Sequence, residues 1–404
     1  MKNTDSGRFW TKAAICTAGY GMMSDSVFAP LVNAIFGQYP DTGLFLQNYI
    51  ISGAAIVSVI TGLLAGVLMK RVSKRRLLIW GTCLFFVGGV GCAVSPDMVW
   101  LAIFRSLDAA SDGILTVTAA AMIVELWHTE REQSQMYGWY NAATCLFGAI
   151  VSVGAGYAAT RSWRLGFAIN AVSILSVILC ILFVPETGIT DGESEQEAPL
   201  EDWEKNLRWR PGAFLLTMLA FAVINILTLV IVVLMDIYVS QQGIGNSVQT
   251  GYLSSLWTLF GLVGSMTATT VMLRFRNRKL YAALFCAASA LDLLAYSLAH
   301  SFALAAAATA VKAVMDGWFF IYYNMYAART VPRRQRGVCL AVFMTLQYAD
   351  SAAAPYVPAM VGRLTGDGTV AAACLFAAAV IGVMAGLYLV IGIVNRKNPA
   401  AISA

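Results

Sequence analysis

Long apolar runs separated by short polar segments dominate the pattern of this chain. Scanned with a window of about 20 residues, the length that crosses a bilayer as an α-helix, the sequence predicts twelve membrane spans. We expect them at residues 13–36, 46–69, 77–95, 98–126, 137–159 and 166–184, then at 212–239, 250–273, 280–298, 302–328, 338–361 and 369–393. The pattern therefore predicts an all-α membrane protein.

One connection is longer than the rest and has a different composition. Residues 185–211 carry a run of acidic side chains followed by Lys205, Arg208 and Arg210. Such a polar segment is typical of a solvated linker. We expect an N-terminal six-helix bundle at residues 1–184, a cytoplasmic acidic linker at 185–211 and a C-terminal six-helix bundle at 212–404.

Composition supports a membrane protein. Hydrophobic residues make up 59% of the 404 residues and charged residues 12%, whereas a soluble domain has about 25% charged residues. The formal net charge is +5, but the basic residues are spread between the spans rather than clustered. That distribution predicts contact with the lipid bilayer and no binding of nucleic acid.

The basic residues also predict the orientation of the chain. Of the 27 Lys and Arg residues, 22 fall on one side of the predicted spans and 3 on the other, namely Arg161, Arg164 and Arg363. Loops rich in Lys and Arg face the cytoplasm. We therefore expect a multi-pass protein of the cytoplasmic (inner) membrane with both termini in the cytoplasm.

Arg105 and Lys312 are the two basic residues inside apolar runs. Charges at bilayer depth are costly and usually mark an ion or substrate pathway. Arg105, Asp108 and Asp112 share one helix face at i, i+3 and i+7, and Lys312 and Asp316 share another at i, i+4. Further acidic residues within predicted spans are Asp25, Asp292 and Asp350.

The two halves of the chain repeat each other at an offset of 204 residues. The basic residues Lys70, Lys74 and Arg75 then align with Arg274, Arg278 and Lys279, the pair Asp112-Gly113 aligns with Asp316-Gly317, and Asp108 aligns with Lys312. This agreement indicates a duplicated six-helix unit, an arrangement in which a central site lies between two halves.

Four segments resemble signatures of the major facilitator superfamily. They are the loop from Gly62 through Gly66 and Lys70-Arg71 to Lys74-Arg75, Leu101–Arg105, Ser162–Phe167 and Val184–Thr187. The resemblance implies two pseudo-symmetric bundles that work by alternating access. It also implies a central cavity lined by spans one, four, seven and ten, where Asp25, Arg105, Asp108, Asp112, Asn225, Lys312 and Asp316 converge.

The chain departs from the loop signature at two positions. Lys70 stands where the family usually has Asp, and Ser73 where it usually has Gly. The usual Asp latches the cytoplasmic side, so another carboxylate is needed here, and Glu125, Glu130 and Glu132 are candidates. We expect the loop residues to control the conformational change: Gly62, Gly66, Lys70, Arg71, Lys74, Arg75, Arg274 and Arg278.

These residues predict a proton-coupled secondary transporter of a small polar organic solute, with an organic anion favoured. Proton coupling is assigned to Asp25, Arg105, Asp108, Asp112, Asp316 and Asp350, and substrate binding to Arg105, Lys312, Asn225, Phe28 and Tyr323. An Asp at bilayer depth exchanges its proton as a neighbouring cation comes and goes. We expect a monomer that uses the proton gradient, with no cofactor and no metal.

Several alternatives stay open. The carboxylates outnumber the buried cations, so a proton-driven exporter of many drugs or lipophilic cations is an open alternative. A membrane enzyme or sensor is the remote alternative, since the sequence offers no catalytic pair, metal-ligand spacing or phosphate loop. The two intrahelical pairs can be static, the aromatic residues can serve packing alone, Asp292 is expected in a structural or lipid-interface role, and Asp236 is expected to be solvated.

Overall fold

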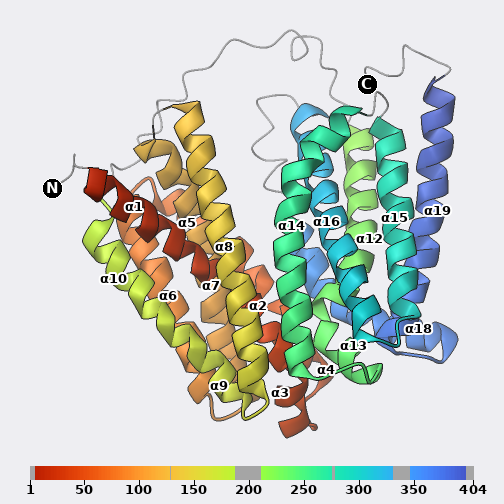
Figure 1. Cartoon of the computed structure of the whole chain (residues 1–404), viewed down its shortest axis with the longest axis horizontal. Helices are drawn as coiled ribbons and strands as arrows, with labels where there is room; N and C mark the ends of the chain where they lie inside the picture. The colour runs from red at the N-terminus through yellow and green to blue at the C-terminus, as the bar shows by residue number, and fades with distance from the viewer. Residues whose placement is uncertain (1–4, 128, 187–210, 275–277, 331–345, 397–404) are drawn as a thin grey trace. The chain divides into compact units, whose positions relative to one another are not determined.

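The computed structural model describes residues 5–127, 129–186, 211–274, 278–330 and 346–396, and all regular structure in these ranges is helical. The first helices are α1 (Asp5–Ala18), η1 (Gly19–Met22), α2 (Ser24–Phe28), η2 (Ala29–Leu31), α3 (Val32–Gln38), α4 (Leu44–Asn48), η3 (Tyr49–Gly53), α5 (Ala55–Leu68), α6 (Lys74–Val94), α7 (Met98–Leu126), α8 (Glu130–Ala159), α9 (Trp163–Ala168), η4 (Ile169–Ser173) and α10 (Ile174–Phe183). After the linker follow α12 (Pro211–Val233), α13 (Met235–Gln241), α14 (Ser247–Arg274), α15 (Arg278–Ser297), α16 (Phe302–Thr330), η5 (Ala354–Tyr356), α18 (Val357–Thr365) and α19 (Val370–Arg396). Figure 1 labels the longer helices. The predicted all-α class is confirmed.

The chain divides into two compact units. One comprises Met1–Pro199 and Thr250–Ser255, and the other comprises Leu200–Gln249 and Leu256–Ala404. Most of the predicted linker, at residues 187–210, lies outside the described residues, so the proposed acidic linker stays a prediction.

Helix length and hydropathy agree with a membrane protein. Within the described residues, eight helices are long and apolar enough to cross a bilayer, and nine if Leu44–Gly53 and Ala55–Leu68, bent by 44°, form one span. Many apolar side chains on these helices point outward, among them Leu182 at 66% and Leu387 at 58% exposure. Lipid tails can cover such surfaces, which water would disfavour. The predicted number of twelve spans stays a prediction.

The first predicted span consists of five short helical pieces between Asp5 and Gln38 rather than one long helix. Turns of 3₁₀-helix at Gly19–Met22 and Ala29–Leu31 interrupt it, and the second contains Pro30. Proline lacks the backbone N–H and its ring clashes with the preceding turn, so a regular α-helix does not continue through it. The first of the two interruptions, at Gly19–Met22, is followed by the new helix α2 at Ser24, and the turn with Pro30 comes after α2.

The helix bounds agree with the repeat of 204 residues seen in the sequence. α7 and α16 have 29 residues each, and α7 starts at Met98 where α16 starts at Phe302. Gly113 of α7 lies against α5, since a Cβ atom there would lie 2.1 Å from the carbonyl oxygen of Ser58. Gly317 of α16 lies against α14 in the same way, with a Cβ 2.6 Å from the amide nitrogen of Ser265. Small residues let membrane helices approach to backbone contact.

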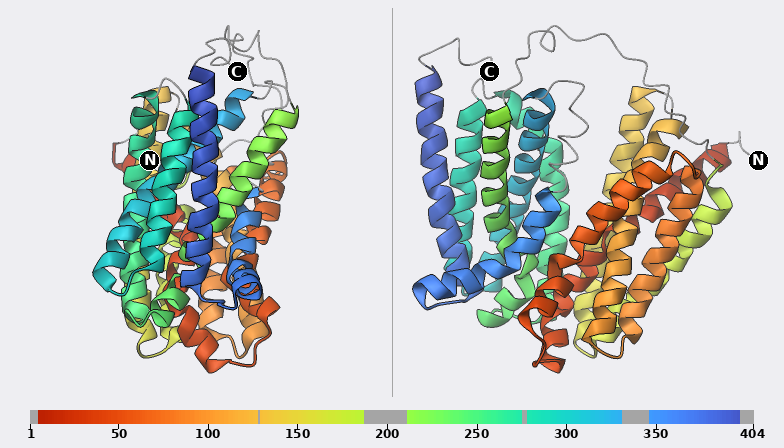
Figure 2. Two further views of the ribbon diagram at one scale, coloured as in Figure 1. Left: turned by 90° about the vertical axis from the view of Figure 1, so that its right-hand side faces the viewer. Right: turned by 180° about the vertical axis from the view of Figure 1, so that it is seen from behind.

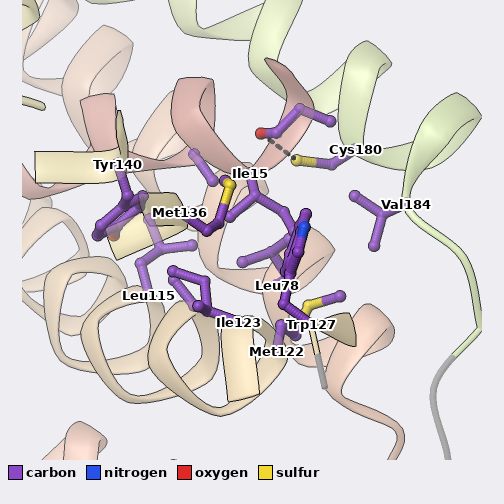
Figure 3. Packing of buried hydrophobic residues seen from close by; sticks show 13 residues of the cluster. Ile15, Leu78, Leu115, Met122, Ile123, Trp127, Met136, Tyr140, Cys180 and Val184 are labelled. Carbon is purple, nitrogen blue, oxygen red and sulfur yellow. Dashed lines mark hydrogen bonds between the residues drawn. The ribbon is translucent and has the colours of Figure 1, made fainter. Parts of the chain in front are cut away.

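Buried apolar side chains of the first unit form a core, which Figure 3 shows from close by. Ile15, Leu115 and Ile123 are fully buried there, and the thiol of Cys180 donates to the carbonyl oxygen of Ala14 at 3.6 Å. The cluster joins α1, α6, α7, α8 and α10. In the second unit α15 and α19 pack along each other, as Figure 2 also shows. These contacts hold fixed the helices that carry the buried charges.

Candidate functional site

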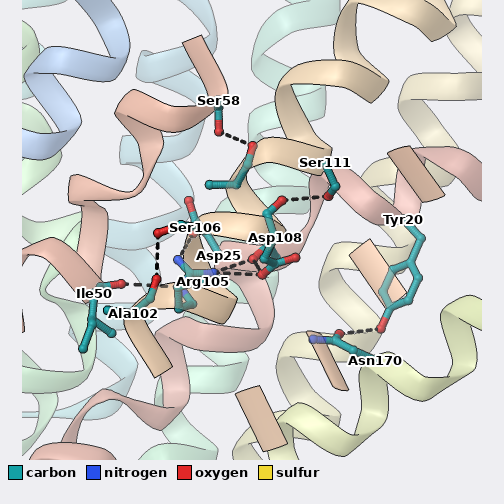
Figure 4. A network of polar contacts seen from close by, with 12 residues as sticks. Tyr20, Asp25, Ile50, Ser58, Ala102, Arg105, Ser106, Asp108, Ser111 and Asn170 are labelled. Carbon is teal, nitrogen blue, oxygen red and sulfur yellow. Dashed lines mark hydrogen bonds and ion pairs between the residues drawn. The ribbon is translucent and has the colours of Figure 1, made fainter. Parts of the chain in front are cut away.

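Arg105 is the centre of the polar network in the first unit (Figure 4). Its helix, α7, begins at an N-cap, Asp97, whose carboxylate accepts from the backbone N–H groups of Val99 and Trp100. Arg105 follows about two turns later and is 3% exposed. The same helix therefore places a permanently charged side chain among packed helices.

Four groups surround the guanidinium. Its Nη2 lies 2.6 Å from Oδ1 of Asp25, and its Nη1 lies 3.2 Å from Oδ2 of Asp108. Nη1 also donates to the hydroxyl of Ser24 at 2.5 Å, and Nε donates to the backbone carbonyl of Ile50 at 3.4 Å. An arginine so buried is stable because its donors are paired and its charge is balanced.

Breaks in two helices bring these partners to Arg105. Ser24 and Asp25 open α2, directly after the interruption of the first span. Ile50 lies in η3, a single turn of π-helix, and such turns free backbone groups and often occur at functional sites. The ring of Phe28, also on α2, covers the guanidinium at 4.5 Å. Phe28, predicted to bind substrate, therefore contacts Arg105 directly.

The two carboxylates of Arg105 differ sharply in exposure. The side chain of Asp108 is 1% exposed, and its Oδ2 also accepts from Ser24. Its Oδ1 has no hydrogen-bond partner among the described residues. The side chain of Asp25 is 80% exposed. Of the two partners of Arg105, Asp25 is the one whose side chain the protein leaves largely uncovered.

Asp112 lies one turn beyond Asp108 on the same helix and is half-buried. The hydroxyl of Thr116 donates to its Oδ1 at 3.4 Å, and it interacts electrostatically with Asp25 and Asp108. The contacts described around Arg105 do not include Asp112. The helical spacing thus identifies Asp108 as a partner of Arg105, while Asp112 stands beside the network.

The second unit holds a corresponding pair on α16. The ammonium of Lys312, 1% exposed, donates to Oδ1 and Oδ2 of Asp316 at 2.6 and 2.7 Å. The indole of Trp257, on α14, donates to Oδ2 of Asp316 at 3.2 Å. The side chain of Asp316 is 22% exposed. This arrangement again combines a buried cation with a more exposed carboxylate.

The remaining predicted residues of this unit lie in two other clusters. The amide of Asn225, on α12, donates to Oδ2 of Asp350 at 3.1 Å. Tyr323 is 1% exposed, its ring meets Phe221 edge-on and Phe319 at a tilt, and its hydroxyl lies 3.0 Å from that of Tyr388. Asn225 and Tyr323 both have partners in this conformation, so a substrate would have to replace these contacts.

Two acidic residues differ from their expected surroundings. Asp236, expected to be solvated, is 2% exposed at the start of α13. Asp292 is 5% exposed, which excludes the lipid-interface position considered for it. Helix packing buries both, and the spacing of charges along the chain carries no signal of that packing.

The predicted gating residues of the first unit differ in their contacts: Lys74 is ion-paired, whereas Lys70 and Arg71 are exposed. Lys74 pairs with Glu125 at 2.5 Å, and Arg8 pairs with Glu132 at 3.5 Å. Lys70 and Arg71 are exposed, a Cβ on Gly62 would lie 3.3 Å from the carbonyl of Gly113, and Gly66 borders open space. Arg274 is exposed, and the side chains of Arg278 and Glu130 lie outside the described residues.

Glu186 joins the loop between α5 and α6 to the end of α10. Its Oε2 accepts from Arg75 at 2.9 Å and its Oε1 accepts from Ser73 at 2.8 Å. These two bonds hold the pKa of the carboxyl below its ordinary value. Arg75 also donates to the carbonyl of Ile181 at 2.7 Å. The loop between α5 and α6 is thereby fastened to the end of α10.

Sequence reasoning missed three groups of the site: the hydroxyl of Ser24, the carbonyl of Ile50 and the indole of Trp257. Each reaches a buried charge from a helix distant in sequence. Serine beside aspartate and tryptophan in an apolar run are both common, so neither stands out. The π-helical turn that frees the carbonyl of Ile50 has no sequence signature.

Solved structures of transporters share this fold. A bacterial homologue of the human lysosomal transporter Spinster, in an inward-facing and unoccupied conformation, matches with a TM-score of 0.70 at 13% identity over 96% of both chains. A D-xylose–proton symporter matches with a TM-score of 0.67 at 18% identity, covering 94% of this chain and 95% of that one. The nucleoside transporter NupG matches with a TM-score of 0.74 at 11% identity, over 94% and 99%.

Related sequences point to the same family. The chain is 21% identical to YvkA, an uncharacterized MFS-type transporter of Bacillus subtilis, over 84% of this chain and 86% of that one. It is 27% identical to the proton myo-inositol cotransporter hmit-1.1 of Caenorhabditis elegans over 35% and 24%. It is 23% identical to the methylenomycin A resistance protein of Streptomyces coelicolor over 44% and 36%.

The family model described as Major Facilitator Superfamily matches residues 13–355, which is most of the chain. The resemblance inferred from the loop and span motifs is thereby confirmed, together with the fold it implies and the absence of an enzymatic role. The chain belongs to the Major Facilitator Superfamily and is a multi-pass membrane transporter.

Proposed function

We propose that the protein couples the transport of a small polar organic solute to protons, and that Arg105 binds an anionic group of the solute. One observation carries this proposal. Arg105 is 3% exposed and shares its charge between Asp108, also buried, and Asp25, whose side chain is 80% exposed. A buried cation with one permanent and one accessible partner is suited to ligand exchange.

The exchange follows from the strengths of the two ion pairs. Removing one partner from a buried pair costs about 3–5 kcal/mol, whereas Asp25 can leave the guanidinium without leaving a carboxylate buried, since its side chain is 80% exposed. A carboxylate or phosphate of the solute therefore displaces Asp25 and leaves Asp108 in place. Asp25, without its cation, then binds a proton from water more readily. Solute binding and proton binding are linked in this way.

Asp112 provides a second place for that proton. It is half-buried and interacts electrostatically with both Asp25 and Asp108. Neighbouring negative charge favours the protonated form of a carboxyl. We assign proton coupling to Asp25, Asp108 and Asp112 around Arg105, and to Asp316 and Asp350 in the second unit.

Lys312 is the second cation proposed to bind the solute, since its partner Asp316 is also partly exposed. Phe28 covers the guanidinium of Arg105 and so limits the directions from which a solute can approach. Asn225 and Tyr323 are proposed to join after they leave Asp350 and Tyr388. The gating roles of the loop residues after α5 and α14 belong to the same proposal.

The cellular setting completes the proposal. The excess of basic residues on one side supports a position in the cytoplasmic membrane with both termini inside. The protein is proposed to work as a monomer, driven by the proton gradient without a cofactor.

A thermal-shift screen tests the binding role of Arg105. Purified protein is heated with organic acids, sugars, amino acids or lipophilic cations at acidic and at alkaline pH. A ligand of the folded state raises the midpoint temperature. We expect stabilisation by organic anions that disappears in Arg105→Ala. Anions that stabilise Arg105→Ala as well as the wild type would contradict binding at this residue.

Uptake into liposomes tests the coupling. With a solute found in the screen, Asp25→Asn should abolish uptake driven by a pH gradient, while exchange of solute across the membrane continues. Asp41→Asn is the matched control, because Asp41 is an exposed aspartate in the loop after α3. Uphill uptake that survives in both Asp25→Asn and Asp112→Asn would refute the mechanism.

Export of drugs or lipophilic cations is the second candidate. One observation favours it: Asp25, Asp108 and Asp112 outnumber Arg105 in the first unit, and unpaired carboxylates attract cations. The partial match to the methylenomycin A resistance protein is in keeping with it. This candidate predicts stabilisation by many lipophilic cations, lost in Asp112→Asn and retained in Arg105→Ala.

A further inference from the structure

Asp292 is a buried acidic residue that has no role in the proposed coupling mechanism. It lies on α15 and is 5% exposed. Its Oδ2 has no hydrogen-bond partner among the described residues, and neither has the hydroxyl of Ser289 one turn earlier. A buried carboxylate that is charged and unpaired is very costly. The carboxyl therefore needs a proton, a cation or both in turn.

Lys312 is a cation whose charge acts on Asp292. α15 packs against α16 and α19, and from α16 the charges of Lys312 and Asp316 both act on Asp292. The thiol of Cys374, on α19, and the hydroxyl of Tyr296, on α15 itself, interact electrostatically with Asp292. Among these neighbours Lys312 is the one that carries positive charge.

The internal repeat places Asp292 beside Lys312 independently. At the offset of 204 residues, Asp292 corresponds to Gly88 and Lys312 corresponds to Asp108. In the first unit those two positions touch, since a Cβ on Gly88 would lie 2.7 Å from the backbone nitrogen of Asp108. The corresponding helix pair of the second unit, α15 and α16, therefore has a carboxylate and a lysine at these two positions.

We propose that Asp292 is the second carboxylate of Lys312 and holds the proton of the second unit while Lys312 is paired with Asp316. One lysine and two carboxyls are neutral together when one carboxyl is protonated, which is the state that burial favours. This inference rests on the proposed proton coupling and adds a residue and an exchange to it.

The exchange conserves charge and protons. In the state described here, Lys312 donates to both oxygens of Asp316, and the carboxyl of Asp292 keeps its proton. When the ammonium turns to Asp292, that carboxyl releases one proton, and Asp316, left without its cation, binds one. Asp316 is 22% exposed and so trades the proton with water. The unit thus repeats the logic of Arg105, with one buried and one accessible carboxylate.

Infrared difference spectra between neutral and alkaline pH test where the proton resides. They use purified full-length protein, and no substrate is needed. We expect a carbonyl band of a buried protonated carboxyl in the wild type that is lost in Asp292→Asn. Asp367→Asn is the matched control in the same unit, because Asp367 is exposed, and it should keep the band. If the spectrum of Asp292→Asn shows the same band as the wild type, the proposal is wrong.

Asp316→Asn separates exchange from a static protonated residue. With Asp316 neutralised, Lys312 should turn to Asp292, which then ionises, so the band of Asp292 should vanish although Asp292 is still present. Persistence of that band in Asp316→Asn would refute the exchange. If Asp292→Asn does not fold, Asp292→Glu keeps a carboxyl and should shift the band in frequency instead of removing it.

The pH profile of uptake tests the link to transport. Asp292→Asn should flatten the profile, whereas Asp367→Asn should leave it unchanged. An unaltered profile would contradict the coupling role even if the band is lost. Failure of the solute site at Arg105 would leave the infrared result as it is, so the two proposals can fail separately.

Discussion

Gly113→Ala tests the backbone contact on which the placement of Asp112 depends. The added Cβ would lie 2.1 Å from the carbonyl oxygen of Ser58, 2.4 Å from the hydroxyl of Thr61 and 2.8 Å from the amide nitrogen of Gly62. Two of these atoms belong to the backbone of α5 and cannot rotate away. α5 must move by about 1 Å to restore ordinary contact, in a close-packed interior.

The expected cost follows from overpacking and helix propensity. Overpacking a well-filled interior costs about 1–3 kcal/mol, and replacing glycine by alanine within a helix returns about 0.5–1 kcal/mol. We expect Gly113→Ala to lower the free energy of unfolding by about 1–2 kcal/mol. For a unit of about 200 residues this corresponds to a Tm lower by about 2–8 °C.

Heating with a thiol-reactive fluorescent dye measures this change. Unfolding exposes buried free thiols, namely those of Cys92, Cys180, Cys286 and Cys374. The control is Gly138→Ala on α8, where a Cβ would have no heavy atom within 4 Å. That variant should keep its Tm or gain slightly. A Gly113→Ala protein as stable as Gly138→Ala would show that α5 and α7 are not held by backbone contact.

Three further predictions concern charged groups. Glu186→Gln tests the bond to Arg75. Folding lowers the pKa of Glu186 below its ordinary 4.5. The bond therefore stabilises the folded protein fully above pH 4.5, and this stabilisation is lost as the pH falls through the pKa of Glu186 in the folded protein. The wild type should therefore have the higher Tm at neutral pH, and the difference should vanish in acid; a difference that grows in acid would refute this. Glu125→Gln leaves the buried ammonium of Lys74 without its charged partner and should cost about 1–3 kcal/mol, measured by Tm, and adding Lys74→Met should recover part of it. Arg105→Lys keeps the charge but has no planar fork to reach four partners, so stabilisation by anions should fall at least about tenfold in apparent affinity while the circular dichroism spectrum is unchanged; unaltered affinity would contradict bidentate positioning.

The sequence predicts those parts of the site that lie on one helix. Arg105 and Asp108 are three residues apart, and Lys312 and Asp316 are four apart, so the helical period alone brings each pair together. The partnership of Arg105 with Asp25 spans 80 residues. It depends on the break at Gly19–Met22, directly before α2, whereas Pro30 lies in the second break, after α2.

Exposure is the property that the sequence predicts least. Asp25 and Asp108 both appear as acids within apolar runs, yet their side chains are 80% and 1% exposed. Asp292, for which a structural or lipid-interface role is expected, is 5% exposed, which agrees with the first and not with the second. Hydropathy places residues along the membrane normal, whereas burial depends on the rotation of each helix about its axis.

The glycine contacts of the two units have a mechanical consequence. Where α5 meets α7 at Gly113, and α14 meets α16 at Gly317, backbone touches backbone with no long side chain between. Sliding one helix along the other would force main-chain atoms past each other, so each pair resists shear. We therefore expect flexing at the 3₁₀ turns of the first span on either side of α2, where the α-helical hydrogen-bond pattern is interrupted. Asp25, the residue proposed to release Arg105, thus lies beside these irregular turns. Asp108, which keeps its contact with Arg105, lies on the regular helix α7.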